Sequence, residues 1–233
     1  MSVLAIAALA LAGCSSPLTL EELEEAEVSR GDFEVDASVI SDFEGLRDDI
    51  PFLIAEDGCS AADEVMAQAA KGQSEFATAF EERNDEQNSF SVSQELIIFE
   101  SEEDASELLD AMESLVASES CEFMYDLTNG DASVDVNSSF TNVERDESVL
   151  TDRADDSFSW DTETTEYWSG DLLYDFSNQS EGAVHLLRFG TAVMIFALNS
   201  TEQLGGFAEL ETDLVFRSDL EAGVVEALSR LSN

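Results

Sequence analysis

The sequence predicts an α+β fold in which an antiparallel sheet packs against several helices in a single compact domain. Helical and strand patterns follow one another in the order helix, hairpin, helix, several strands and helix. Hydrophobic residues make up 44% and aromatic residues 9% of the 233-residue chain, which is enough to bury a substantial core. No internal repeat or linker divides the predicted body, so we expect one domain over residues 38–233.

Two helices are predicted at the start of this body. Apolar residues recur at helical spacing over residues 38–53, where Pro51 stops the pattern. Residues 59–72 predict a short helix with Ser60 as its cap. Lys71, the one lysine of the chain, lies at the end of this helix, where the dipole favours a cation.

A hairpin and the clearest helix of the chain come next. Residues 74–82 and 89–100 predict two strands joined by the turn-forming segment RNDEQN. Residues 101–121 predict a helix with Ser101 as its cap. Its apolar residues lie on one face and comprise Ala105, Leu108, Leu109, Met112, Leu115 and Val116.

The second half of the chain is rich in predicted strands. Residues 138–145, 156–164 and 171–178 alternate or run apolar between polar breaks. Residues 182–199 contain two apolar runs around Arg188-Phe189-Gly190, which predict the central hairpin of the sheet.

A helix is predicted at the end of the sequence, over residues 218–233. Ser218 and Glu221 have the spacing of a capping box. The apolar residues of this helix share a face and comprise Leu220, Val224, Leu228 and Leu231.

The first residues predict where the protein is located. Residues 3–12 form an apolar run that is too short to span a bilayer and has the length of a signal-peptide core. Leu11-Ala12-Gly13-Cys14 resembles a bacterial lipobox, in which the chain is cut before a cysteine that then carries lipid. We expect a signal peptide over residues 1–13 and lipid attachment at Cys14, which places the protein on the extracytoplasmic face of the cell membrane. The alternative is an ordinary secretory signal cut near Ala12 or Gly13.

Residues 14–37 predict an acidic tether between the lipid and the folded body. The segment is polar and has little apolar periodicity; the alternative for its part LEELEEAEV is a transient helix. About 20 flexible residues span roughly 25 Å, so such a tether would hold the domain clear of the membrane.

The two remaining cysteines, Cys59 and Cys121, form an even pair in an exported chain. We expect them to form a disulfide, which would stabilise the fold by roughly 4 kcal/mol through the reduced entropy of the unfolded chain. The alternative is two free thiols.

The charge balance limits the class of partner. The chain has 53 Asp and Glu residues against 9 Lys and Arg residues, a formal net charge of −44. Such a surface repels phosphate backbones, which excludes ordinary nucleic-acid binding. The acidity fits a solvated surface in a saline exterior; the alternative is recruitment of cations or of a basic partner.

Several of these features resemble the PknH-like extracellular sensor domain, which is found on certain actinobacterial Ser/Thr kinases and on stand-alone lipoproteins. Cys59 precedes a short helix, and residues 92–121 give a strand, a helix and Cys121. Residues 184–198 resemble the hairpin of the family with its Arg-x-Gly turn, and a helix ends the chain. The family often carries two disulfides, whereas this chain can form one. The resemblance implies a sensor or binding domain with a cleft and without established catalysis.

Catalytic and metal motifs are weak. His185 is the one histidine and lies in an apolar run, so a sheet residue is favoured over a catalytic base, and a zinc site lacks ligands. Oxygen-bearing side chains alternate as in a calcium loop, but Val136 occupies the position of the turn glycine, which favours an exposed edge strand. The residues of this segment are Asp131, Ser133, Asp135 and Asn137.

Trp160, Tyr167 and Trp168 are close in the sequence and flanked by acidic residues. Core packing is favoured for them; exposed in a cleft, they would suit a cationic or sugar-like ligand.

Together these features predict a membrane-anchored extracytoplasmic lipoprotein with a ligand-binding or sensor-like domain. We predict no catalytic residue, metal or cofactor, and the ligand-binding residues are unknown. The partners expected are the cell membrane, through the lipid, and a small molecule, a cation or an envelope protein. A carboxylate-dependent cell-envelope hydrolase and a structural surface protein are the alternatives.

Overall fold

The computed structural model describes residues 18–33, 38–39, 60–83, 88–118, 124–129, 132–145, 150–170, 176–204 and 217–232. Within them, eight strands form a sheet in the order β1-β2-β3-β8-β7-β6-β5-β4, and every neighbouring pair is antiparallel. The strands are β1 (Ser38–Val39), β2 (Gln73–Arg83), β3 (Asn88–Ile98), β4 (Met124–Asn129), β5 (Ala132–Arg145), β6 (Asp156–Gly170), β7 (Phe176–Phe189) and β8 (Ala192–Leu204).

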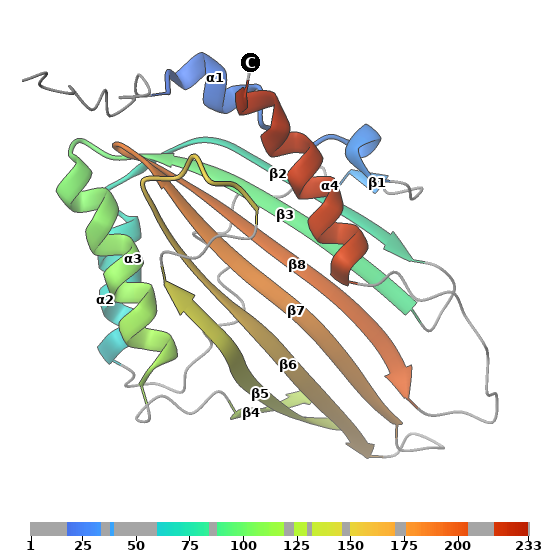
Figure 1. The fold of residues 1–233 in the computed structure, drawn as a ribbon. Coiled ribbons are helices and arrows are strands. Elements are labelled where there is room, and N and C mark those ends of the chain that lie inside the picture. The colour runs from blue at the N-terminus through green and yellow to red at the C-terminus, as the bar shows by residue number, and fades with distance from the viewer. Residues whose placement is uncertain are drawn as a thin grey trace, which may run out of the picture.

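Helices cover both faces of this sheet (Figure 1). They are α1 (Leu20–Glu24), α2 (Ser60–Ala69), α3 (Glu102–Val116) and α4 (Arg217–Ser229), with the short 3₁₀ turns η1 (Arg30–Asp32) and η3 (Arg230–Ser232). Helices α2 and α3 lie side by side against one face, which we call the α2–α3 face. Helix α4 and residues 18–33 lie against the other, which we call the α4 face. The predicted antiparallel sheet with packed helices is therefore confirmed.

Each face has its own apolar core, because successive side chains of a strand point to opposite sides. The larger members on the α2–α3 face include Ile97, Leu108, Leu109, Met112, Leu115, Phe158, Trp160, Leu186 and Ile195. Those on the α4 face include Phe33, Phe90, Leu96, Leu187, Met194, Phe196, Leu220, Leu228 and Leu231.

The predicted hairpins are present, and the second one is central. Strands β2 and β3 pair from Gln73↔Ile98 to Arg83↔Ser89. Strands β7 and β8 occupy the two middle positions of the sheet and turn at Gly190, whose φ of 61° favours glycine.

Helices α3 and α4 have the apolar faces that the sequence predicts. In α3, Ser101 Oγ accepts a hydrogen bond from the Asp104 N–H at 3.1 Å, which confirms the cap. The stripe of α3 is buried apart from the half-buried Val116. Ser60 and Ser218 lie within the first turns of α2 and α4 instead of preceding them.

Two of the elements predicted from the sequence differ in the structure. Residues 38–53 do not begin as a helix, because Ser38 and Val39 pair with β2; residues 40–53 lie outside the described residues. Residues 176–178, the described end of the strand predicted over residues 171–178, and residues 182–189 of the predicted central hairpin belong to one strand, β7. The polar residues between them lie on a sheet that continues past the core, so they do not end the strand.

The expectation of a tether over residues 14–37 is wrong for residues 18–33, which we call the strap. Its apolar residues Leu23, Ala26, Val28 and Phe33 are buried on the α4 face. A capping box closes the start of α1, because Glu22 Oε2 accepts from the Thr19 N–H and Thr19 Oγ1 accepts from the Glu22 N–H. These few apolar residues are enough to hold an acidic segment against the body because they pack into the apolar core of the α4 face.

A buried side chain from the sheet holds the middle of the strap. Gln94 on β3 has no solvent exposure. Its Oε1 accepts from the Val28 N–H at 2.6 Å, and its Nε2 donates to the Ala26 carbonyl at 3.1 Å. The amide thus takes the place of a neighbouring strand for two backbone groups of the strap.

Arg230, at the start of η3, clamps the end of the strap. Its guanidinium donates to the carbonyls of Glu25 and Glu27, at 2.6 and 2.7 Å, and to the Asp32 carboxylate at 2.6 Å. Burial raises the pKa of Asp32, but hydrogen bonds from Arg230 and Ser29 outweigh it and hold the pKa below its ordinary value. Gly223 of α4 lies so close to the Phe33 ring that a β-carbon there would collide with it.

No helix in the described part of the chain is long and apolar enough to cross a membrane. Cys14, Cys59 and Cys121 lie outside the described residues, so the lipid attachment and the disulfide stay predictions.

Replacing Gln94 with Met should release the strap. The Val28 N–H and the Ala26 carbonyl would each lose a buried partner, and an unsatisfied buried group costs about 1–3 kcal/mol. Trypsin should then cut faster after Arg30, which is exposed in η1, and the urea midpoint should fall. Thr78→Val is the control because it removes only the exposed hydrogen bond from Thr78 Oγ1 to Glu27. Equal cleavage rates in both variants would contradict the role of Gln94.

Candidate functional site

The structure places the sequence-predicted site residues apart. His185 is buried on β7 in the α4 face, with Nε2 3.9 Å from Glu221 Oε1 of α4. Trp160 is buried on the α2–α3 face, where it packs on Phe158 and edge-on against Phe140. Tyr167 and Trp168 lie farther along β6, and their side chains are outside the described part.

The segment with the partial calcium-loop pattern is a strand. Residues 132–137 belong to β5 and pair with β4 on one side and β6 on the other, so they do not form an edge strand. Asp131 lies outside the described residues. Among the residues that the structure describes, no three His, Cys, Asp or Glu side chains gather as metal ligands would.

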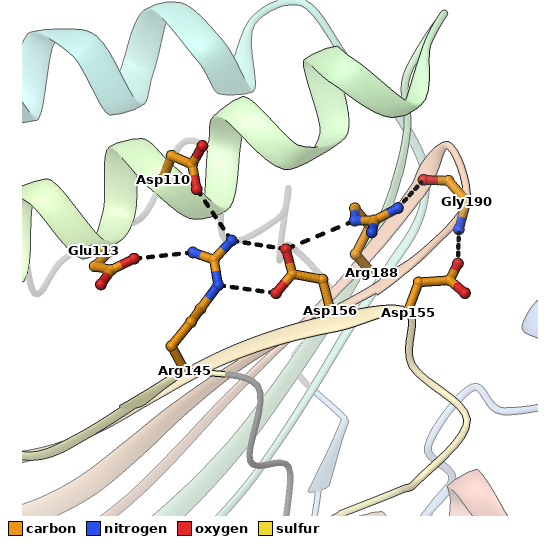
Figure 2. Close-up of polar contacts among 7 residues, drawn as sticks. All are labelled: Asp110, Glu113, Arg145, Asp155, Asp156, Arg188 and Gly190. Atoms are coloured by element: carbon orange, nitrogen blue, oxygen red, sulfur yellow. Dashed lines mark hydrogen bonds and ion pairs between the residues drawn. The ribbon is translucent and has the colours of Figure 1, made fainter.

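Arg145, at the end of β5, is the centre of a polar network (Figure 2). Its Nε and Nη2 donate to the two carboxylate oxygens of Asp156 on β6, at 2.9 and 2.7 Å. Nη2 also contacts Asp110 at 3.0 Å and Nη1 contacts Glu113 at 3.2 Å, both on α3. One guanidinium thus joins two strands to a helix.

The network continues into the central hairpin. Arg188 Nε lies 3.9 Å from Asp156 Oδ2, and Nη1 donates to the Gly190 carbonyl at 3.3 Å. The Gly190 N–H donates to Asp155 Oδ2 at 2.7 Å, which pins the turn to the start of β6 (Figure 2).

The electrostatics of this network favour a structural role over anion binding. Burial lowers the pKa of Arg145, but the hydrogen bond and charge of Asp156 outweigh it and raise the pKa. The guanidinium therefore stays charged, and three carboxylates of the chain already use its donors. An anionic ligand would have to displace them.

Lys71 makes a similar but more exposed junction. Its Nζ contacts Glu107 at 2.7 Å and Asp104 at 3.3 Å, which joins the end of α2 to α3. The hydrogen bond from Ser101, followed by that from Lys71, lowers the pKa of Asp104. Lys71 thus forms ion pairs with the neighbouring helix α3, in addition to its favourable position at the C-terminal end of α2.

The α2–α3 face of the sheet changes character along the strands. Phe158, Leu186 and Ile195 lie in register beneath the helices. At Thr162, four residues after Phe158 on β6, the residues on this face are polar or glycine. This next set, which we call the polar row, lies in register across β2, β3, β8, β7 and β6 and comprises Glu81, Ser91, Asn199, Gly182 and Thr162.

The polar row is a candidate binding surface. Thr162 and Gly182 are buried, and Glu81, Ser91 and Asn199 are half-buried. A β-carbon at Gly182 would collide with Thr162 Oγ1, so the glycine makes room for this hydroxyl. Figure 1 shows β6, β7 and β8 extending past the ends of α3 and α4.

Trp160 lies in the row next to Thr162, between the apolar core and the polar row. Its Nε1 is buried and has no hydrogen-bond partner within the described structure. Trp160 is packed in the core, as the sequence favours, so the hydroxyl, amide and carboxylate groups of the polar row are the ones that can bind a hydroxyl-rich or cationic small molecule.

Sequence reasoning missed the buried polar pair on β3. Gln94 and Glu95 are both fully buried, one on each face of the sheet. The available signal was two adjacent polar residues inside an apolar strand, because the alternation of a strand sends one to each core.

No family model and no curated protein matches this chain significantly. The resemblance to the PknH-like sensor domain therefore stays a prediction.

Proposed function

We propose that this protein is a lipid-anchored extracytoplasmic lipoprotein whose folded body binds or senses a small ligand and performs no catalysis. The lipobox order of residues 11–14 supports the anchor. The body is proposed to be one domain, to which the strap belongs together with residues 38–233.

The polar row is the observation that carries the binding role. Five neighbouring strands contribute it, and a site on strands holds its groups in fixed positions. Serine, asparagine and glutamate of this row are half-buried and its threonine is buried, and hydroxyl, amide and carboxylate groups in fixed positions can hydrogen-bond a ligand.

The hydrolase alternative has less support. His185, the one histidine, faces α4 on the opposite side of the sheet from the polar row. Glu81 is the one carboxylate of the row itself, whereas glycoside hydrolysis needs a pair.

The ligand class follows from these groups. Hydroxyls and an amide suit a hydroxylated small molecule, and Glu81 and the acidic surface favour a positive charge on it. The other partner is the membrane that carries the lipid.

The anchor is tested by phase partition. In a bacterial host, and with its native start, the protein should enter the detergent phase, and Cys14→Ser should move it to the aqueous phase because the acyl chains are lost. Ser16→Ala, which keeps the cysteine, should partition like the unmodified chain. Detergent partition of the Cys14→Ser protein would refute lipid attachment.

The binding role is tested by native mass spectrometry of protein purified from its own host. We expect an added mass that is lost on denaturation and is absent or reduced in Ser91→Val, because a hydroxyl of the polar row is removed. Thr191→Val, at the exposed β7–β8 turn, should retain the ligand. No added mass, or equal retention in the two variants, counts against the polar row as the site.

A further inference from the structure

The strap begins only four residues after Cys14, the proposed site of the lipid. Its first described residue, Leu18, packs against the core of the α4 face. Four residues of fully extended chain reach at most about 14 Å. If Cys14 carries the lipid, the folded body therefore starts within that distance of the membrane surface.

The strap is fixed to the body along its length, so it does not lengthen the connection between the lipid and the body. Gln94 holds its middle from within the sheet. Arg230 holds Glu25, Glu27 and Asp32 from the C-terminal end of α4. Lengthening the tether would require breaking these contacts and exposing buried apolar side chains.

The beginning of the strap lies at one end of the sheet. Leu18 packs in the same core cluster as Leu150 and Ala154, which precede β6. The charge of Arg153 acts on Glu22 of α1. Figure 1 shows α1 beside the C-terminal end of α4, above this end of the sheet.

The polar row lies away from that end. Thr162 is six residues along β6 from Asp156, which corresponds to about 20 Å of strand. A body held at its α1 end thus carries the polar row outward, away from the lipid.

We propose that the protein stands on its own membrane in one orientation, with α1, η3 and residues 150–155 facing the headgroups and the polar row directed outward. This inference rests on the proposed lipid anchor. The partner of the α1 end is the headgroup surface of the anchoring bilayer. Glu21, Glu24 and Glu25 are exposed on and next to α1, so close approach favours zwitterionic over anionic lipid.

The orientation is tested with the full lipidated chain in phosphatidylcholine vesicles that contain lipid with a spin-labelled headgroup. A fluorescent amino acid is placed genetically at Glu24 or at Glu163, both of which are exposed. Glu163 is seven residues along β6 from Asp156. We expect quenching at position 24 to exceed that at position 163 several-fold, and equal quenching at the two positions would overturn the proposal.

A second variant separates the short connection from general crowding at the surface. Insertion of 20 Gly/Ser residues between Pro17 and Leu18 should remove most of the difference between the two positions, because it restores a tether of about 25 Å. An undiminished difference would mean that the connection does not set the orientation. Intact mass first verifies acylation of Cys14, so absence of lipid would refute the proposed anchor and is distinguished from a wrong orientation.

Discussion

A shortage of positive charge is the constraint on which the rest of this structure depends. The chain has 53 acidic residues and only 9 Lys and Arg residues, so each cation can oppose the mutual repulsion of many carboxylates. Those with contacts in the described structure lie where elements meet. Lys71 joins α2 to α3, Arg145 joins β5 and β6 to α3, and Arg230 joins the chain end to the strap. At these three junctions a cation offsets the repulsion between carboxylates of neighbouring elements.

Neutral hydrogen bonds complement these ion pairs where burial excludes charge. Gln94 satisfies two backbone groups of the strap inside the core without introducing a charge. The strap thereby gives α4 a surface to pack against, and the α4 face becomes a core instead of an exposed sheet. The same contacts determine how close a lipid at Cys14 would hold the body, so the fold and the proposed orientation share one cause.

Local patterns predicted much of this fold. The cap of α3, its apolar stripe and the central turn at Gly190 depend on residues close in sequence, and these predictions are confirmed. The strap was not predicted, because its buried residues are sparse among glutamates and the groups that hold it, Gln94 and Arg230, are distant in the sequence. The continuity of β7 was missed because its polar middle belongs to a sheet longer than its core. The polar row was also missed, since strand register determines which residues of five strands become neighbours.

The central claim is that the half-buried cation junctions stabilise the fold through specific pairs and not through net charge alone. A double-mutant cycle with Arg145→Gln and Asp156→Asn tests it directly, with Lys71→Gln and Glu107→Gln as the exposed counterpart. The side chain of Arg145 is 22% exposed and that of Lys71 is 42% exposed. We predict a coupling free energy of about 1–3 kcal/mol for the bidentate Arg145–Asp156 pair and a smaller one for the solvent-screened Lys71–Glu107 pair. Equal couplings, or none for Arg145–Asp156, would contradict the account.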